Sequence, residues 1–269
     1  MPEPTASRRD DANRDVVSPE LARAVAGTGF REVRWFRSLD STNRYLVDEA
    51  AAGTRPGLVV VADEQSAGRG RLGRTWIAPP GASLLVSVLI EGGAPAEERH
   101  LALLAAALAA VDAVDELCGF RPRLKWPNDL VVGDRKLAGL LAEAAADAIV
   151  VGMGLNIDWD SFPRELEETA TACNREGRPA PRADLLVAWL RGLDRRRRAL
   201  AEGGPATIHA DQVAASATIG RRVRVERARD VLEGEAVALT ELGHLVVRTG
   251  DGVSHTVTAG DVVHLRPTA

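Results

Sequence analysis

Residues 65–76, with the sequence Gln-Ser-Ala-Gly-Arg-Gly-Arg-Leu-Gly-Arg-Thr-Trp, alternate three glycines with three arginines. Glycine permits backbone with positive φ and close approach to a ligand. Arginine carries a permanent charge on a planar fork of donors that suits phosphate or carboxylate. Apolar runs at 58–62 and 83–90 flank the segment. The pattern predicts an anion-binding loop between two strands, with a solvated basic turn or a short nucleic-acid contact as the alternatives.

The composition is that of an ordinary soluble globular protein. Its 269 residues can bury a sizeable core in one domain or two. Hydrophobic residues make up 45% and charged residues 27% of the chain, and the net charge is −4. No overall basic field therefore attracts nucleic acid or an acidic membrane. No stretch approaches the roughly 20 apolar residues of a membrane-spanning helix. We expect neither nucleic acid nor a membrane as partner.

The start of the chain and its cysteines show no sign of export. The first residues are polar and charged, without the apolar core of a signal peptide, so we expect a disordered lead-in over residues 1–28. Cys118 and Cys173 have no paired metal-binding spacing and suggest no disulfide framework. These features favour a cytoplasmic protein.

Hydroxyl and amide side chains follow a predicted strand at 33–38. Ser41, Thr42 and Asn43 precede an apolar-periodic run that ends at Gly53. Such residues commonly cap the N-terminus of a helix, and a helix N-terminus also presents donors to an anion. The pattern predicts a helix whose first turn is capped by these side chains and can also bind an anion.

A second predicted strand, at 149–156, contains the alternate glycines Gly152 and Gly154 and ends at Asn156. The segment is no dinucleotide fingerprint, because Ile157 stands where the third glycine would fall and no helix pattern follows. Alternate glycines within a strand indicate close approach by a ligand or another backbone.

The sequence Lys-Trp-Pro-Asn-Asp-Leu at residues 125–130 leads into a predicted β-hairpin around Gly-Asp at 133–134. Strict alternation places Lys136 on the same strand face as Ala138 and Leu140. A lysine at this place either extends to solvent or points into a polar site. The surface position is the commoner one, since lysine is rarely buried unless paired.

The rest of the chain divides into helices, one long connection and a run of strands. Apolar periodicity predicts helices at 95–120 and 183–200. The intervening residues 158–181 form a polar, irregular connection. From about residue 216, short strand-like runs punctuated by glycine predict a small antiparallel barrel or sandwich.

Four segments, in chain order, resemble the motifs of the biotin protein ligases: residues 40–43, 65–76, 125–130 with 136–141, and 152–156. The resemblance implies an α+β fold. A mixed β-sheet catalytic domain of the biotin/lipoate ligase type would span 29–215, and a small C-terminal SH3-like β-barrel would span 216–269. It also implies a short form without the DNA-binding domain of some relatives, because the stretch before the first strand is too short for one.

The activity implied by the resemblance has two steps. Biotin and ATP first give biotinyl-5′-AMP and pyrophosphate, and the biotinyl group then passes to a specific lysine of a biotin carboxyl carrier domain of an acyl-CoA carboxylase. The expected partners are therefore biotin, ATP with Mg²⁺, and the carrier domain. We expect the protein itself to be a monomer or a weak homodimer.

The residue types suit this chemistry. A carboxylate and a phosphate repel each other, so cations must hold them together and offset the negative charge that develops on the phosphoryl oxygens. The predicted catalytic residues are Lys136, Arg69 and Asp129, with Asp129 also the predicted metal ligand. The predicted biotin-binding residues are Ser41, Thr42, Asn43, Gln65, Gly68, Arg69, Gly70, Arg71, Lys136, Gly139, Gly152 and Gly154. The predicted ATP- and adenylate-binding residues are Arg69, Arg71, Arg74, Trp76, Lys125, Asn128, Lys136 and Asn156.

Two other functions fit parts of the pattern. A lipoate or octanoate ligase or transferase would share the fold, although the transferases depend on a cysteine nucleophile and Cys118 and Cys173 lie in no site motif. A non-catalytic protein that binds biotin or a carrier domain would need the pocket but neither Lys136 nor Asp129.

Overall fold

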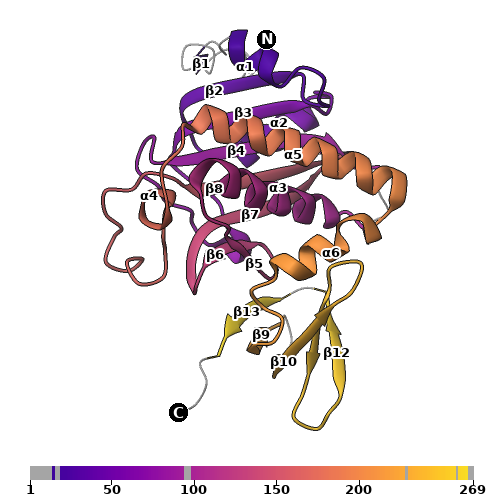
Figure 1. Ribbon diagram of the computed structural model, residues 1–269. Coiled ribbons are helices and arrows are strands. Elements are labelled where there is room, and N and C mark those ends of the chain that lie inside the picture. The colour runs from indigo at the N-terminus through magenta and orange to yellow at the C-terminus, as the bar shows by residue number, and fades with distance from the viewer. Residues whose placement is uncertain (1–13, 16–18, 94–97, 228–229, 259, 266–269) are drawn as a thin grey trace, which may run out of the picture.

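The computed structural model describes residues 14–15, 19–93, 98–227, 230–258 and 260–265. They form an N-terminal domain around one mixed sheet and a smaller all-β C-terminal domain, drawn in yellow at the foot of Figure 1.

The N-terminal sheet has eight strands in the order β1-β2-β3-β4-β8-β7-β6-β5. β2 and β3 run parallel, and the other neighbouring pairs are antiparallel, so the predicted mixed sheet is confirmed. The strands are β1 (Arg14–Asp15), β2 (Glu32–Leu39), β3 (Leu58–Gln65), β4 (Ser83–Glu91), β5 (Arg123–Lys125), β6 (Asp129–Val132), β7 (Arg135–Ala145) and β8 (Ala148–Asn156).

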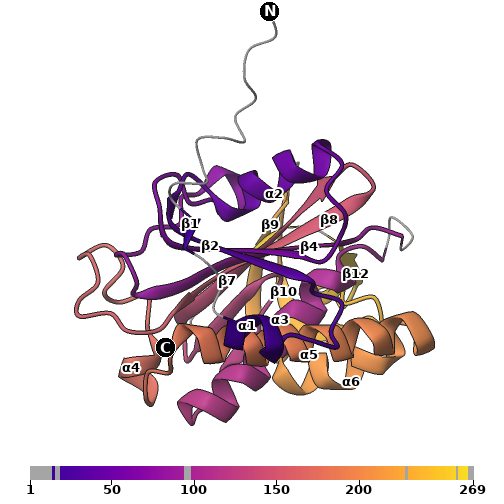
Figure 2. The same ribbon diagram turned by 90° about the horizontal axis from the view of Figure 1, so that it is seen from above.

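Helices cover both faces of this sheet. Figure 2 shows α1, α3, α5 and α6 on one face and α2 on the other. β4 lies between these layers with eight successive buried residues, which explains why its sequence is a continuous apolar run instead of an alternating one. The helices are α1 (Pro19–Ala24), α2 (Thr42–Ala51), α3 (Leu101–Cys118), α4 (Cys173–Glu176), α5 (Arg182–Gly203) and α6 (Ala206–Ala215).

The helices α3 and α5 pack closely against each other and match two predicted helices. α3 ends at Gly119, whose φ of 80° is the left-handed conformation that glycine adopts readily. In α5, a Cβ atom added at Gly192 would lie 3.1 Å from the Cβ atom of Ala109 in α3. Among the residues that the structure describes, no helix combines the length and apolar content needed to cross a membrane.

The N-terminal residues differ from the expected lead-in over 1–28. Residues 1–13 and 16–18 lie outside the described part, but Arg14–Asp15 pairs with β2. Leu21 in α1 and Val25 just after it are buried in the main core. The expectation is therefore wrong for these segments, because two apolar side chains one helical turn apart are enough to hold a short helix against α5.

The connection between β8 and α5 is more ordered than its polar sequence indicates. Trp159 and Phe162 are buried and stack with ring centroids 4.3 Å apart. They form a small apolar cluster with Ala82, Ala170 and Ala172. The expected irregular segment is thus tied down by a few apolar residues that are too widely spaced to show a period.

A β-bulge in β7 changes the predicted orientation of Lys136. Leu130 of β6 pairs with Ala138, and the next residue, Val131, pairs with Lys136, so Leu137 is the extra residue. A bulge breaks strict alternation. Leu137 and Ala138 both enter the main core, and Lys136 is released to the opposite face. The prediction that Lys136 shares a face with Ala138 is therefore wrong.

The C-terminal domain is a five-stranded antiparallel sheet in the order β12-β11-β10-β9-β13, as predicted. The strands are β9 (Arg222–Glu226), β10 (Val231–Leu239), β11 (Leu245–Arg248), β12 (Ser254–Val257) and β13 (Asp261–His264).

Trp126 of the N-terminal domain joins the two domains. Its ring is buried within the apolar core of the C-terminal sheet. Its indole Nε1 donates to the carbonyl of Gly243 at 3.0 Å, and its backbone N–H donates to Thr218 Oγ1 at 3.0 Å. The Lys-Trp-Pro-Asn-Asp segment is therefore anchored from both domains.

Replacement of Gly192 by leucine should destabilise the protein, because the added atoms have no space against Ala109. Overpacking of this kind typically costs about 1–3 kcal/mol. The measurement is urea-induced unfolding followed by circular dichroism. Ala201→Leu, at an exposed position of the same helix, is the matched control and should change the unfolding midpoint little. A Gly192→Leu midpoint equal to that of the control would contradict the close helix packing.

His264 makes the stability of the folded protein sensitive to acid. Its Nε2 lies 3.2 Å from Thr218 Oγ1, and its side chain is 8% exposed. Burial, together with the charges of Lys125 and Arg221, lowers the pKa of His264 to about 4. The folded protein therefore holds a neutral ring at pH values where an unfolded chain binds a proton.

Stability should fall as the pH drops from about 6.5 to about 4, by up to about 3 kcal/mol from this group. The unfolded histidine has the ordinary pKa of about 6.5 and takes up the proton first, so acid favours unfolding. Urea unfolding at several pH values would measure the slope. His264→Asn should remove this part of the pH dependence, and an unchanged slope in the variant would refute the assignment.

Candidate active site

A cavity of about 390 Å³ lies between the glycine- and arginine-rich loop, strands β7 and β8, the start of α2 and the connection that follows β8. Nearly all of the predicted site residues line it. They are Ser41, Thr42, Asn43, Gln65, Arg69, Gly70, Arg71, Arg74, Trp76, Lys125, Asn128, Asp129, Lys136, Gly139, Gly152, Gly154 and Asn156. Segments far apart in the sequence thus converge on one pocket.

Gly68 is the predicted site residue that the pocket does not include. Its carbonyl accepts the backbone N–H of Trp76 at 2.9 Å, and an added Cβ atom would lie 2.3 Å from the Trp76 carbonyl oxygen. Gly68 therefore shapes the base of the loop and allows it to close on itself.

Hydrogen-bonding side chains gather where α2 begins, a region called here the hydroxyl end and made of Ser41, Thr42, Asn43 and Gln65. Ser41 caps α2 through a hydrogen bond from the Arg44 backbone N–H, as predicted. The Oε1 of Gln65 accepts from the backbone N–H and the hydroxyl of Thr42 at 2.8 and 3.0 Å. This fixes the Gln65 amide, so its NH₂ group is the donor that remains for a ligand.

Ser87 of β4 supports the hydroxyl end from below. Its hydroxyl lies 2.7 Å from Thr42 Oγ1 and 2.6 Å from Asn43 Oδ1, and all three residues are buried. Sequence reasoning missed Ser87, because one serine within an apolar strand gives no signal until the helix above it is placed.

Three glycines form the floor of the pocket. Gly139 of β7 pairs with Gly154 of β8, and Leu141 pairs with Gly152. A Cβ atom at Gly154 would lie 2.4 Å from Trp76 Cε2. Without it, the indole of Trp76 lies against the strand pair. Its Nε1 is buried and has no hydrogen-bond partner within the described residues, which leaves a donor for a ligand.

Gly152 leaves space for a side chain of the protein in the same way as Gly154 does. A Cβ atom added there would lie 1.9 Å from Asn43 Oδ1. The two glycines that are predicted to bind biotin thus make room for side chains of the protein: Asn43 above Gly152 and Trp76 above Gly154.

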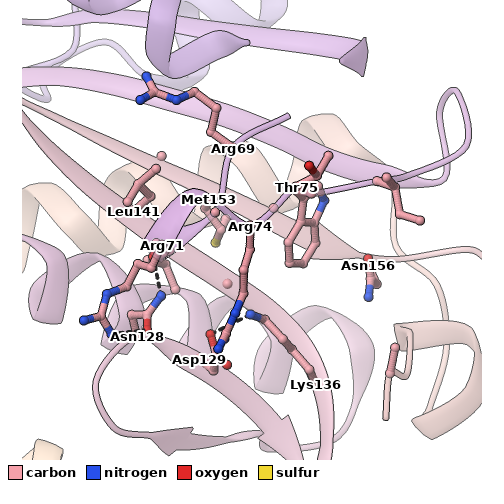
Figure 3. A pocket seen from close by; sticks show the side chains of 18 of the residues that line it. Arg69, Arg71, Arg74, Thr75, Asn128, Asp129, Lys136, Leu141, Met153 and Asn156 are labelled. Carbon is pink, nitrogen blue, oxygen red and sulfur yellow. Dashed lines mark hydrogen bonds and ion pairs between the residues drawn. The ribbon is translucent and has the colours of Figure 1, made fainter. Parts of the chain in front are cut away.

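Three cations, with one amide and one carboxylate beside them, lie at the opposite end of the pocket. This region is called here the cationic end and consists of Arg71, Arg74, Asn128, Asp129 and Lys136 (Figure 3). Lys136 Nζ lies 2.8 Å from Asp129 Oδ1 and 5.5 Å from the centre of the Trp76 ring. The β-bulge therefore places the lysine amine in the pocket and settles the choice between surface and site.

The C-terminal domain completes the cationic end. Arg71 donates to Asn128 Oδ1 at 3.1 Å and to the carbonyl of Gly260 at 3.2 Å, and Arg74 forms an ion pair with Asp261. Burial lowers the pKa of Arg71, although an arginine remains charged near neutral pH. Sequence reasoning missed Asp261, which lies 187 residues from Arg74 and in no recognised motif.

Asn156 holds the wall of the pocket. Its Oδ1 accepts from Ser83 Oγ at 3.2 Å, and its Nδ2 donates to the carbonyl of Thr171 at 3.0 Å. The amide therefore ties the end of β8 to the connection that carries Trp159 and Phe162, both of which line the pocket and were not predicted as site residues.

The acidic groups near the pocket are few. In the part of the chain that the structure describes, no group of three or more histidine, cysteine, aspartate or glutamate side chains is placed to hold a metal ion. Asp129, the predicted ligand, offers carboxylate oxygen beside Lys136.

Comparison with known proteins gives matches for both domains. Residues 35–160 match the biotin/lipoate A/B protein ligase family, and residues 218–265 match the biotin protein ligase C-terminal domain. The chain is 39% identical to the biotin–[acetyl-CoA-carboxylase] ligase of Mycobacterium tuberculosis over 249 residues, which cover 90% of this chain and 92% of that protein.

Solved structures agree with the sequence matches. The biotin protein ligase of Aquifex aeolicus, solved in complex with biotin and ATP, superposes with a TM-score of 0.78 at 26% identity and covers 88% of this chain and 100% of its own. The fold and the pocket define a ligase of the biotin and lipoate class. The chain belongs to the biotin protein ligase family.

Gly154→Ala should displace the Trp76 ring, because the new Cβ atom overlaps it. We expect a shifted indole N–H resonance of Trp76 in a two-dimensional NMR spectrum and a stability loss of about 1–3 kcal/mol. Gly250→Ala is the control, since a Cβ atom there meets nothing within 4 Å. A Trp76 resonance at its parental position in Gly154→Ala would show that the ring does not rest on this glycine.

Proposed function

We propose that the chain is a biotin protein ligase. It activates biotin with ATP to biotinyl-5′-AMP and transfers the biotinyl group to a specific lysine of a biotin carboxyl carrier domain. The observation that carries the proposal is one cavity with an amide- and hydroxyl-lined end and a cationic end. Relatives that are named biotin–[acetyl-CoA-carboxylase] ligases support a carrier domain of an acyl-CoA carboxylase.

The two ends suit the two substrates. The cyclic urea of biotin needs donors and an acceptor, which the hydroxyl end supplies. The nucleotide needs cations and an aromatic surface, which Arg71, Lys136 and Trp76 supply. The other predicted residues that line the cavity keep their predicted roles in this proposal, except that Arg69, which is paired with Glu143 away from the cationic end, is assigned to biotin and not to ATP. Gly68 shapes the base of the loop.

In the first step, a carboxylate oxygen of biotin attacks the α-phosphorus of ATP. The bond from that phosphorus to the bridging oxygen breaks, and pyrophosphate leaves. Both reactants are anions, so fixed cations at the point of contact lower the barrier by stabilising charge on the phosphoryl oxygens. Lys136 is the cation assigned to this point in the proposal, and its amine lies against Asp129 and the face of Trp76.

In the second step, the amine of the carrier lysine attacks the carbonyl carbon of the mixed anhydride. The bond to the phosphate oxygen breaks, AMP leaves and the nitrogen loses a proton. The anhydride is already activated, so no nucleophile of the ligase is needed. This fits a pocket lined by neither cysteine.

Mg²⁺ would accompany the nucleotide. This ion prefers oxygen ligands and commonly binds through one or two carboxylates and the phosphates of its substrate. Asp129 is the carboxylate of the cationic end that fits this role, and the ion would supply charge neutralisation to the phosphates. We further propose that the protein works in the cytoplasm, which agrees with two free, buried cysteines.

A lipoate or octanoate ligase is the second candidate, because the matched family includes lipoate ligases. A transferase with a cysteine nucleophile is disfavoured. Hydrogen bonding with Cys118 and burial raise the pKa of Cys173, and neither thiol lines the pocket. The purified chain with MgATP, a carrier domain and biotin, lipoate or octanoate in parallel would decide. Transfer of biotin alone supports the proposal, and transfer of lipoate or octanoate alone refutes it.

Lys136→Ala should slow pyrophosphate release by about 10²–10³-fold while the fold survives, since loss of a preorganised charge-stabilising group has this typical effect. Thermal unfolding followed by circular dichroism would check the fold. Lys136→Arg is the charge-preserving control and should retain more activity than the alanine variant. Parental pyrophosphate release by a folded Lys136→Ala protein would exclude the assigned role.

A further inference from the structure

Glu143, on β7, joins the arginine loop to the hydroxyl end. The two oxygens of its carboxylate have different partners. Oε2 accepts from Asn43 Nδ2 at 2.7 Å, and Oε1 lies 3.0 Å from Arg69 Nη1. The glutamate side chain is 22% exposed and that of Arg69 is 48% exposed. The carboxylate is therefore the fixed member of the pair, and the arginine is the member that can move.

Asn43 holds the carboxylate in one orientation. Its Oδ1 accepts from Ser87 Oγ at 2.6 Å, and it lies in the space left by the missing side chain of Gly152. Its Nδ2 must therefore face Glu143. An unbroken series of polar contacts thus runs from the buried Ser87 hydroxyl through Asn43 and Glu143 to Arg69.

The three loop arginines have separate positions. Figure 3 shows Arg69 pointing away from Lys136, whereas Arg71 and Arg74 extend toward Asn128 and Asp129. Arg71 and Arg74 are bonded at the cationic end, and Arg69 is bonded beside Asn43 of the hydroxyl end. The two parts of the loop are therefore held over the two ends of the pocket by different contacts.

We propose that Glu143 is a positioning residue: it holds Arg69 across the hydroxyl end and so sets how long biotin stays bound. The inference rests on the proposed function. Three like charges in a glycine-rich loop repel one another and favour an open loop, and Glu143 offsets this at the biotin end. Affinity for the nucleotide depends on the cationic end and is independent of this pair.

Glu143→Gln tests the proposal, because the glutamine keeps an oxygen that can accept from Asn43 and loses only the charge. We measure biotin dissociation from the full chain by stopped flow, and KM for ATP in the adenylation assay. A partly exposed ion pair of this kind corresponds to about threefold to fivefold faster dissociation of biotin. KM for ATP should stay at the parental value. Glu116→Gln, the same change on the exposed side of α3, is the matched control and should behave as the parent.

A double-mutant cycle with Arg69→Ala separates positioning from a purely structural role. If Glu143 acts through Arg69, Glu143→Gln has no further effect on biotin dissociation once Arg69 is removed, whereas additive effects would overturn the proposal. Parental biotin dissociation in Glu143→Gln, or an equal rise in KM for ATP, would also overturn it. A parent chain that binds no biotin would refute the proposed function and this inference together, while a parent that binds biotin isolates the role of Glu143.

Discussion

β7 and β8 pair so that Gly139 faces Gly154 and Leu141 faces Gly152, and the pocket depends on the missing side chains at this crossing. A strand pair with ordinary residues would fill the space where Asn43 and Trp76 lie. Because the side chains above the floor are fixed by its shape, the donors of the hydroxyl end and the face of the indole are in place before a ligand arrives. Preorganisation of this kind lowers the entropy that binding must offset.

Three cations around the pocket are each paired with a carboxylate. Lys136 lies against Asp129, Arg74 against Asp261 and Arg69 against Glu143. In each pair the cation is more exposed than its carboxylate. Exposed pairs contribute little stability, so at the cationic end, where Lys136 and Arg74 lie, a phosphate with more charge can replace the carboxylate at little cost. The ligand-free protein thus keeps its cations near their sites of use without burying an uncompensated charge.

Sequence reasoning selected residues that line one cavity, but it did not give all of their geometry. The glycine and arginine loop, the Ser-Thr-Asn turn and the alternate glycines are local patterns, so they could be recognised without the fold. Lys136 was placed on the wrong strand face because the bulge at Leu137 depends on pairing with β6. Asp261, Ser87 and Glu143 could not be found, because each gains its role from a contact with a distant segment. The connection that carries Trp159 was expected to be irregular, since its few apolar residues show no period.

Trp126 lies in the core of the C-terminal sheet although its neighbours in the chain line the pocket. The two domains therefore do not have separate cores, because a side chain of the N-terminal domain completes the core of the C-terminal domain. Such a chain cannot be treated as two exchangeable modules. A C-terminal domain taken from another protein would bring a cavity of a different shape for the indole, and any mismatch would pass directly to Asn128, two residues along the chain. The pocket and the second domain are thus bound to change together during evolution.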